Sequence, residues 1–212
     1  MSIYKTQVFG KNSFFARQDL YSHEIKAISI RESMKEIIDN QLPKKITQNY
    51  NEGYKNIIIA SGLLLPKKTL EKNFDEIQRS YKTNLILPVL ISELLLSKFN
   101  NVKILLIGSE SGVKGSYDTE YWLSKAALLS YAKERKVKTH QQLNILCPSV
   151  VKDSPMTENR HDSKELNELT APKGRFLSAS EVVKLSQQVF KNEYLCNTSI
   201  NLDGGKFARQ NY

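Results

Sequence analysis

The sequence predicts an α/β fold, a Rossmann-like doubly wound parallel sheet with helices on both faces in three layers. Short apolar runs rich in β-branched residues and leucine alternate along the chain with segments whose apolar residues recur at helical spacing. Two of the apolar runs end in a glycine, Gly10 and Gly108, where the chain would turn at the edge of a sheet. A chain of 212 residues can bury one sizeable core, so we expect a single domain over residues 1–212.

The expected elements follow one another as strand and helix. Strands are predicted over 6–10, 25–30, 55–61, 102–107, 143–147 and 198–202. Helices are predicted over 33–41, 73–96, 117–134 and 178–190. Within the long helix, Asn84 can interrupt local backbone bonding, and Pro88 favours a kink. Residues 149–178 are polar with little periodicity, and we interpret them as a loop or lid over a substrate.

The segment 102–127 carries the residues with the most specific chemistry. Ser109 follows a strand directly, at the end where open α/β sheets place ligands. Tyr121 and Lys125 lie four residues apart, so they share one face of a helix. An ammonium beside a phenol lowers the phenol pKa from its ordinary value of about 10, which suits a general acid or base. Ser109 would orient a carbonyl or alcohol oxygen beside that phenol.

A tyrosine and a lysine at this spacing are weak evidence by themselves. With ten tyrosines in a lysine-rich chain, about one such pair is expected by chance. The alternative is a packed aromatic ring beside a solvated lysine. The order of strand, Gly-Ser, short loop and Tyr-x-x-Ser-Lys favours the catalytic interpretation.

Five segments together resemble the short-chain dehydrogenase/reductase family. Residues 107–112 (IGSESG) are similar to its catalytic-serine turn, and 121–125 (YWLSK) to its Tyr-x-x-Ser-Lys. Residues 56–62 (NIIIASG) resemble its Asn-Asn-Ala-Gly strand with both asparagines replaced, and Asn84 matches its helix asparagine. Residues 144–149 and 201–205 resemble two further motifs. The resemblance implies Ser109, Tyr121, Lys125 and Asn84 as catalytic residues, with Asn84 supporting a proton relay.

The same resemblance implies a nicotinamide cofactor. Gly10 matches the first glycine of the phosphate-binding turn, whereas Ala16 stands where the last glycine would be, so phosphate binding is weakened or rearranged. Arg31 with Lys11 favours NADP(H) over NAD(H), because an arginine can neutralise a 2′-phosphate. The alternative, with equal weight, is that Arg31 and Lys11 are solvated surface charges. The implied cofactor-binding residues are Gly10, Lys11, Asn12, Ser13, Phe14, Arg31, Ala60, Ser61, Gly62, Tyr121, Lys125, Pro148 and Val151.

Composition narrows the partners. The net charge is +9, but the basic residues are spread without a nucleic-acid motif, so we expect no nucleic-acid partner. No apolar run is long enough to span a membrane, so we expect no membrane partner. Cys147 and Cys196 are the only cysteines, which favours a reducing compartment and a cytoplasmic protein. The three histidines lie apart among polar residues, and no metal site is expected.

Two function classes follow. The first is an NAD(P)H-dependent oxidoreductase that acts on a small carbonyl/alcohol pair, with a sugar nucleotide or another anionic molecule as the conceivable substrate. The alternative is a Rossmann-type dinucleotide-binding or regulatory module without turnover, which the depleted glycine turn favours. By resemblance, helices 73–96 and 117–134 would pair copies of the chain into a homodimer or homotetramer.

Overall fold

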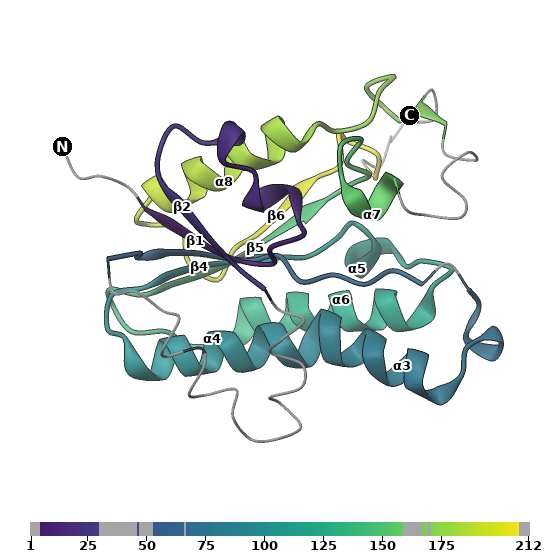
Figure 1. Cartoon of the computed structure of the whole chain (residues 1–212), viewed down its shortest axis with the longest axis horizontal. Helices are drawn as coiled ribbons and strands as arrows, with labels where there is room; N and C mark the ends of the chain where they lie inside the picture. Colours follow the sequence, from purple (N-terminus) through teal and green to yellow (C-terminus); the bar gives the residue numbers. More distant parts are fainter. Residues whose placement is uncertain are drawn as a thin grey trace, which may run out of the picture.

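Six parallel strands form one sheet in the order β2-β1-β3-β4-β5-β6 (Figure 1). This computed structural model describes residues 5–29, 46, 53–65, 67–158, 167–168 and 171–207. The strands are β1 (Thr6–Phe9), β2 (Ile25–Ile28), β3 (Asn56–Ile59), β4 (Lys103–Ile107), β5 (Gln142–Pro148) and β6 (Ser199–Leu202). Each lies within two residues of its predicted bounds at either end. The predicted helix 33–41 and the predicted cofactor-binding residue Arg31 lie outside the described residues.

Helices cover both faces of the sheet (Figure 1). One face packs against α4 (Leu87–Lys98) and α6 (Thr119–Glu134), and the other against α8 (Ala179–Lys191). Alternate strand residues point to opposite faces, so Phe9 and Ile59 join the first apolar layer while Val8 and Ile58 join the second. This confirms the predicted three-layer α/β fold.

The order in which strands are added to the sheet reverses at β1. The second strand, β2, lies on one side of β1, and the third strand, β3, lies on the other side. Such a switch point opens a crevice at the carboxyl ends of the strands. Gly10 sits there with a φ of +135°, and a Cβ on it would lie 3.0 Å from the carbonyl oxygen of Ala60. Only glycine therefore fits this turn without strain.

The turn after β1 does not lead into a long helix. Two short 3-10 helices follow it, η1 (Phe14–Ala16) and η2 (Gln18–Leu20). Phe14 and Phe15 are buried against the layer that contains α8, so this segment contributes to the core. The turn therefore lacks a long helix whose amino end could stabilise the negative charge of a pyrophosphate.

The long helix is continuous but changes its winding around Asn84. Asn73 caps α3 (Phe74–Tyr81) by accepting a hydrogen bond from the Glu76 amide at 2.9 Å. A π-helical turn, η4 (Lys82–Ile86), then leads into α4. Pro88 lacks the N–H that would close a regular turn there, which accounts for the wider turn before it. The predicted irregularity at Asn84 is thus confirmed.

The inward face of α6 is more polar than its apolar pattern indicated. Ser124 and Lys125 are buried, whereas Trp122 is 36% exposed and Leu123 is 41% exposed. Trp122 lies away from the buried face because the helix turns its Tyr-x-x-Ser-Lys side toward the sheet. Two short helices, α5 (Ser111–Lys114) and α7 (Pro155–Glu158), were also not predicted.

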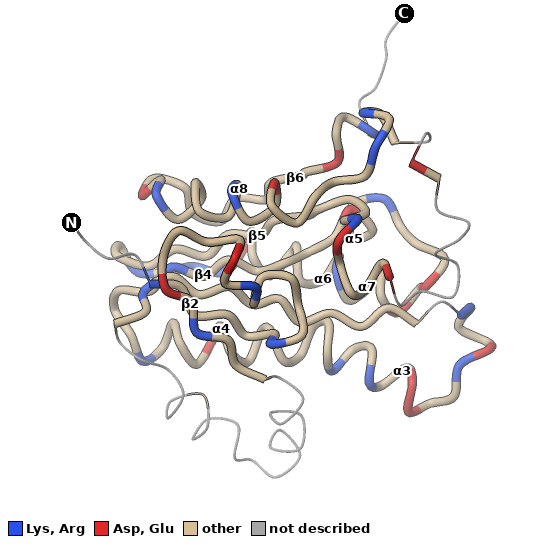
Figure 2. The backbone as a smooth tube through the Cα atoms, turned by 45° about the horizontal axis from the view of Figure 1, so that its top comes forward, with Lys and Arg blue, Asp and Glu red and all other residues tan. Residues whose placement is uncertain are grey.

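Charged residues of both signs are interspersed along the chain. Figure 2 shows Lys and Arg positions on both layers of helices, with Asp and Glu positions among them. Among the described residues, none of the helices has the length and apolar character needed to cross a membrane.

Candidate functional site

A cavity of about 940 Å³ lies at the carboxyl ends of the strands, around the switch point. Ser109 lines it, together with every predicted cofactor-binding residue that the structure describes. These are Gly10, Lys11, Asn12, Ser13, Phe14, Ala60, Ser61, Gly62, Tyr121, Lys125, Pro148 and Val151. Asn84 does not line it. The fold therefore brings together residues that lie up to about 140 positions apart in sequence.

The amino end of α6 fixes the position of Tyr121. Asp118 caps the helix, and its Oδ1 accepts a hydrogen bond from the Tyr121 amide at 3.0 Å. Gly112 lets the serine turn pack directly on α6, because a Cβ there would lie 2.8 Å from the carbonyl carbon of Lys125. This close approach places the end of β4 against the helix face that carries Tyr121 and Lys125.

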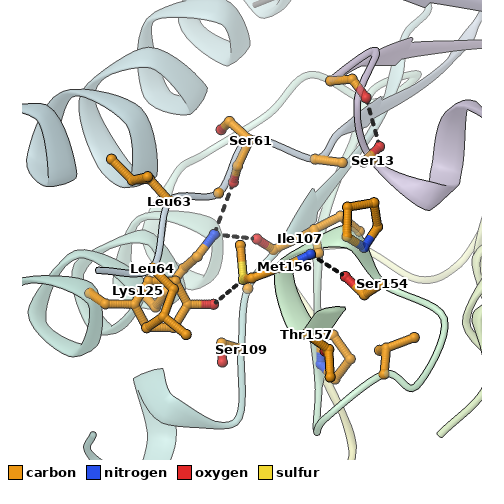
Figure 3. A pocket seen from close by; sticks show the side chains of 18 of the residues that line it. Ser13, Ser61, Leu63, Leu64, Ile107, Ser109, Lys125, Ser154, Met156 and Thr157 are labelled. Atoms are coloured by element: carbon orange, nitrogen blue, oxygen red, sulfur yellow. Dashed lines mark hydrogen bonds between the residues drawn. The ribbon is translucent and has the colours of Figure 1, made fainter. Parts of the chain in front are cut away.

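Lys125 is buried, and none of the described carboxylates pairs with it. Its Nζ donates to the carbonyl oxygens of Ile107 at 2.8 Å and Ser61 at 3.2 Å (Figure 3), and it lies 5.8 Å from the centre of the Tyr121 ring. Burial lowers the pKa of Lys125 to about 8. The ammonium can therefore act on the phenol at neutral pH and loses its charge in mildly alkaline solution.

This depressed pKa predicts a pH-dependent stability. The folded chain releases the Lys125 proton at about pH 8, whereas the unfolded chain keeps it up to about 10.5. Because the unfolded state binds more protons in that window, the free energy of unfolding should rise by roughly 3 kcal/mol across it. Urea unfolding of wild type and Lys125→Met between pH 7.5 and 10 measures this, and the rise should be missing from the variant.

Lys133→Met, on the exposed side of the same helix, is the matched control and should keep the wild-type pH dependence. A pH dependence that is identical in wild type and Lys125→Met would contradict the assignment of the rise to Lys125.

Ser109 is nearly buried at the edge of the cavity. Its Oγ accepts a hydrogen bond from the Ser111 amide at 3.1 Å, which fixes the oxygen and leaves its O–H to donate. Ser61, at the end of β3, is also buried, and its Oγ has no hydrogen-bond partner among the described residues. A buried hydroxyl without a partner is uncommon, so Ser61 is available to a bound ligand.

Met156 of α7 points into the cavity (Figure 3), where it lies next to both Tyr121 and Gly62. The Tyr121 hydroxyl donates to its Sδ at 3.9 Å, and a Cβ on Gly62 would lie 2.6 Å from its Cε. Both ends of the segment that carries Met156 are anchored, because Lys152 N–H donates to Leu177 O at 2.8 Å and Leu177 N–H donates to Val150 O at 3.1 Å. A ligand that reaches both Gly62 and Tyr121 must displace this side chain.

Asn84 holds the loop that follows β3. Its Oδ1 accepts from the Leu63 amide and its Nδ2 donates to the Leu63 carbonyl, both at 2.8 Å, and Nδ2 also donates to Ser80 Oγ at 3.1 Å. Asp118 Oδ2 accepts from the Leu65 amide at 2.8 Å. Two residues thus position the cavity wall at Leu63 and Leu64.

A buried charge cluster next to Tyr121 was missed from the sequence. The Lys72 ammonium contacts Asp118 Oδ1 at 2.6 Å and also contacts Glu120, and the Lys72 and Asp118 side chains are completely buried. Burial opposes the charge on Lys72, but the two carboxylates outweigh it and raise the lysine pKa. Lys72 is 46 residues from Asp118 in sequence, so no local pattern indicates the contact.

The part of the chain that the structure describes contains no group of three or more histidine, cysteine or acidic side chains placed to hold a metal ion. Cys147 is buried and Cys196 is half-buried, and both are free thiols.

The fold and the cavity define the chain as having the short-chain dehydrogenase/reductase fold. Searches of protein-family models and of curated protein sequences find no match. Solved structures match over nearly the whole chain. A short-chain dehydrogenase/reductase family oxidoreductase from Burkholderia thailandensis superposes with a TM-score of 0.79 at 17% identity, covering 99% of this chain and 94% of that chain.

Two further similar structures are those of enzymes with named activities. The aldohexose dehydrogenase of Thermoplasma acidophilum, in ligand-free form, has a TM-score of 0.77 at 14% identity, covering 99% of this chain and 96% of that chain. The 3-ketoacyl-(acyl-carrier-protein) reductase of Brucella melitensis, complexed with NADH, has a TM-score of 0.76 at 12% identity, covering 96% and 98%. The resemblance noted in the sequence is thereby confirmed for the fold.

Proposed function

We propose that the protein is an NAD(P)H-dependent oxidoreductase of the short-chain dehydrogenase/reductase type, which interconverts a carbonyl and an alcohol. The observation that carries the proposal is the convergence of Ser109, Tyr121 and Lys125 on one cavity at the switch point of the sheet. Lys125 is held there as a buried ammonium without a carboxylate partner among the described residues, a costly placement that a merely structural lysine does not need.

Each residue has a definite task in this reaction. Tyr121 transfers a proton at the reacting oxygen, and the Lys125 ammonium favours the ionised phenol and holds the nicotinamide ribose. Ser109, whose oxygen is fixed by the Ser111 amide, donates its O–H to the same reacting oxygen. For Asn84 we propose a positioning role through Leu63 in place of the predicted proton relay, because its side-chain hydrogen bonds are used there.

The residues around the switch point fit a dinucleotide. Gly10 allows close approach of the backbone, and the Ser61 hydroxyl has no other partner among the described residues. A bound nicotinamide would supply or accept the hydride. We propose NADP(H) rather than NAD(H), because Lys11 lines the cavity and makes no ion pair among the described residues. The NADH bound to the Brucella reductase is a property of that protein.

An anionic substrate such as a sugar nucleotide is consistent with Arg79 of α3. Arg79 is an exposed residue that lines the cavity, and it makes no ion pair among the described residues. Lys152, by contrast, is paired with Glu168 at 3.1 Å. We further propose that the protein works in a reducing compartment such as the cytoplasm, because both thiols are free.

We propose a homodimer or homotetramer assembled through the outer faces of α3, η4, α4 and α6. These faces carry large apolar side chains that are 36% to 71% exposed, namely Phe74, Ile86, Leu90, Trp122 and Leu123. The molar mass in solution, measured by light scattering, tests this assembly.

Cofactor titration followed by turnover tests the proposed reaction. NADPH and NADH are titrated by fluorescence, and NADPH oxidation is then followed with a panel of aldehydes, ketones and sugar nucleotides. The proposal expects tighter binding of NADPH and turnover with at least one member of the panel. Tight binding without oxidation of any member would favour the second candidate, a dinucleotide-binding or regulatory module, which is supported by the short helices after Gly10 and by Met156 beside Tyr121.

Met156 should compete with the cofactor for its site. Because the side chain must leave its contacts with Tyr121 and Gly62 when a nicotinamide enters, Met156→Ala should tighten NADPH binding by about 5- to 10-fold. Fluorescence titration of wild type, Met156→Ala and the control Glu158→Gln, an exposed residue of α7 that does not line the cavity, measures the dissociation constants. Weaker binding by Met156→Ala would show that the side chain supports the cofactor.

A further inference from the structure

Arg79 of α3 is an exposed cation on the wall of the cavity. It forms no ion pair with the described residues. Glu76, one turn earlier on the helix, is already engaged, because its Oε1 contacts the Lys67 ammonium at 2.7 Å and its Oε2 accepts from the Asn73 amide at 3.1 Å. The Arg79 guanidinium is therefore available to an anion that a ligand brings.

The charges on the cavity wall are mostly positive. Among the described residues that line it, the charged ones are Lys11, Arg79, Lys125 and Glu110. Glu110, the carboxylate of this group, is paired with Lys206 at 3.0 Å, so it offsets little of the positive charge. Surplus positive charge in a cavity raises the local concentration of an anionic ligand.

The winding of the helix places Arg79 on a different side from the residues that hold the loop after β3. Ser80 and Asn84 face that loop, where Asn84 bonds to Leu63 at 2.8 Å. Arg79 and Thr83 each precede one of these two residues, which rotates them by about 100° around the helix axis. Because Arg79 and Thr83 also line the cavity, they form a second wall of it.

This second wall lies on the β1 side of the cavity. The loop after β3 is tied to α6, because Asp118 Oδ2 accepts from the Leu65 amide at 2.8 Å. The helix α6 connects β4 to β5, whereas β1 and β2 lie on the other side of β3. Arg79 therefore faces the half of the cavity over β1 and β2, which Lys11 and Ser29 also line.

A phosphate in this half of the cavity has no long helix to stabilise it. The turn after β1 leads only into the short helices η1 and η2, so the amino end of a long helix is not aimed at a ligand there. A guanidinium can replace that positive charge, because its planar fork binds a phosphate through two parallel hydrogen bonds.

We propose that Arg79 binds a phosphate of the nicotinamide dinucleotide and takes the place of the missing helix amino end. A phosphate of the cofactor and an anionic substrate would satisfy the guanidinium equally well by charge, and the position of Arg79 on the β1 side favours the cofactor. This inference rests on the proposed binding of a dinucleotide, and it holds whether or not the protein turns that dinucleotide over.

Fluorescence titration of NADPH and NADH tests the proposal without turnover. Arg79→Gln should weaken binding by about 10- to 30-fold, the effect of losing a hydrogen bond between charged groups. Arg79→Lys should weaken it less, because the charge remains without the planar fork. Lys82→Gln, which changes the net charge equally, is the control and should bind as wild type does, because Lys82 donates to Gln78 at 3.3 Å and does not line the cavity.

The two cofactors identify the phosphate. A loss of the same size for both assigns Arg79 to the pyrophosphate that they share, and a loss confined to NADPH assigns it to the 2′-phosphate. The inference is overturned, with the proposed function left in place, by dissociation constants of Arg79→Gln within about two-fold of wild type for both cofactors or by an equal loss in Lys82→Gln. Wild type that binds neither cofactor would contradict the inference and the proposed function together.

Discussion

Tyr121→Phe should lower kcat by about 10²- to 10⁴-fold while NADPH affinity stays within about two-fold of wild type. The Tyr121 side chain is buried to 6% exposure at the cavity, and its amide is fixed by Asp118, so phenylalanine can take the same place. The substitution removes the hydroxyl, including its 3.9 Å contact with the Met156 sulfur, and keeps the ring. The lost rate is therefore attributable to proton transfer at the reacting oxygen.

Single-turnover rates and fluorescence titration measure the two quantities separately. Tyr194→Phe is the matched control, because Tyr194 is 98% exposed and lies far along the chain from the cavity residues. If Tyr121→Phe kept more than about a tenth of the wild-type rate, Tyr121 would not be the acid or base, and the chemistry would have to be assigned to another group in the cavity.

Local pattern was sufficient to predict the strands and to place the proposed reacting groups relative to them. A buried parallel strand reads as a short apolar run, so 102–107 identified β4, and Ser109 followed directly at its carboxyl end. Tyr121 and Lys125 lie one helical turn apart, which places them on one face whatever the rest of the fold does. These residues were predictable because each depends on neighbours within a few positions.

The contacts that hold the cavity wall were not predictable, because they join residues that lie far apart in the sequence. Asn84 reaches Leu63 across 21 residues, and Asp118 reaches Leu65 across 53. The start of the long helix at residue 73 was predicted from the sequence, and Asn73 caps it in the structure, but no spacing relates Lys72 to Asp118. The burial of Lys125 in place of Trp122 likewise depends on how α6 packs on the sheet and not on its hydrophobic pattern.

The turn after β1 shows a limit of a different kind. Gly10 was expected to meet a phosphate, and its positive φ and close contact with Ala60 now explain why a glycine stands there even without a ligand. Ser13 Oγ donates to Gly10 O at 2.7 Å, so the turn is closed by its own hydrogen bond. A sequence motif can thus reflect a backbone requirement and a binding site at once, and only a ligand titration separates the two.

Lys72→Met should destabilise the protein by about 3–5 kcal/mol, because it leaves the Asp118 and Glu120 carboxylates buried without their cation. Burial alone would raise the pKa of Glu120, and the bonds from Lys72 and other groups keep it low in the folded state. Without the lysine, the Asp118 and Glu120 carboxylates at the amino end of α6 would repel each other, and the segment before α3 would no longer be tied to them. Urea unfolding of wild type and variant at pH 7 gives the change.

A nearby exposed pair provides the control. Lys67 contacts Glu76 at 2.7 Å, but its side chain is 45% exposed, so Lys67→Met should cost less than about 1 kcal/mol. The double variant Lys72→Met/Glu120→Gln should be more stable than Lys72→Met, because one of the two stranded charges is removed. Asp118 also accepts hydrogen bonds from the Tyr121 and Leu65 amides, so Lys72→Met should displace the cavity wall as well. Equal losses for Lys67→Met and Lys72→Met would show that the buried cluster does not anchor α6.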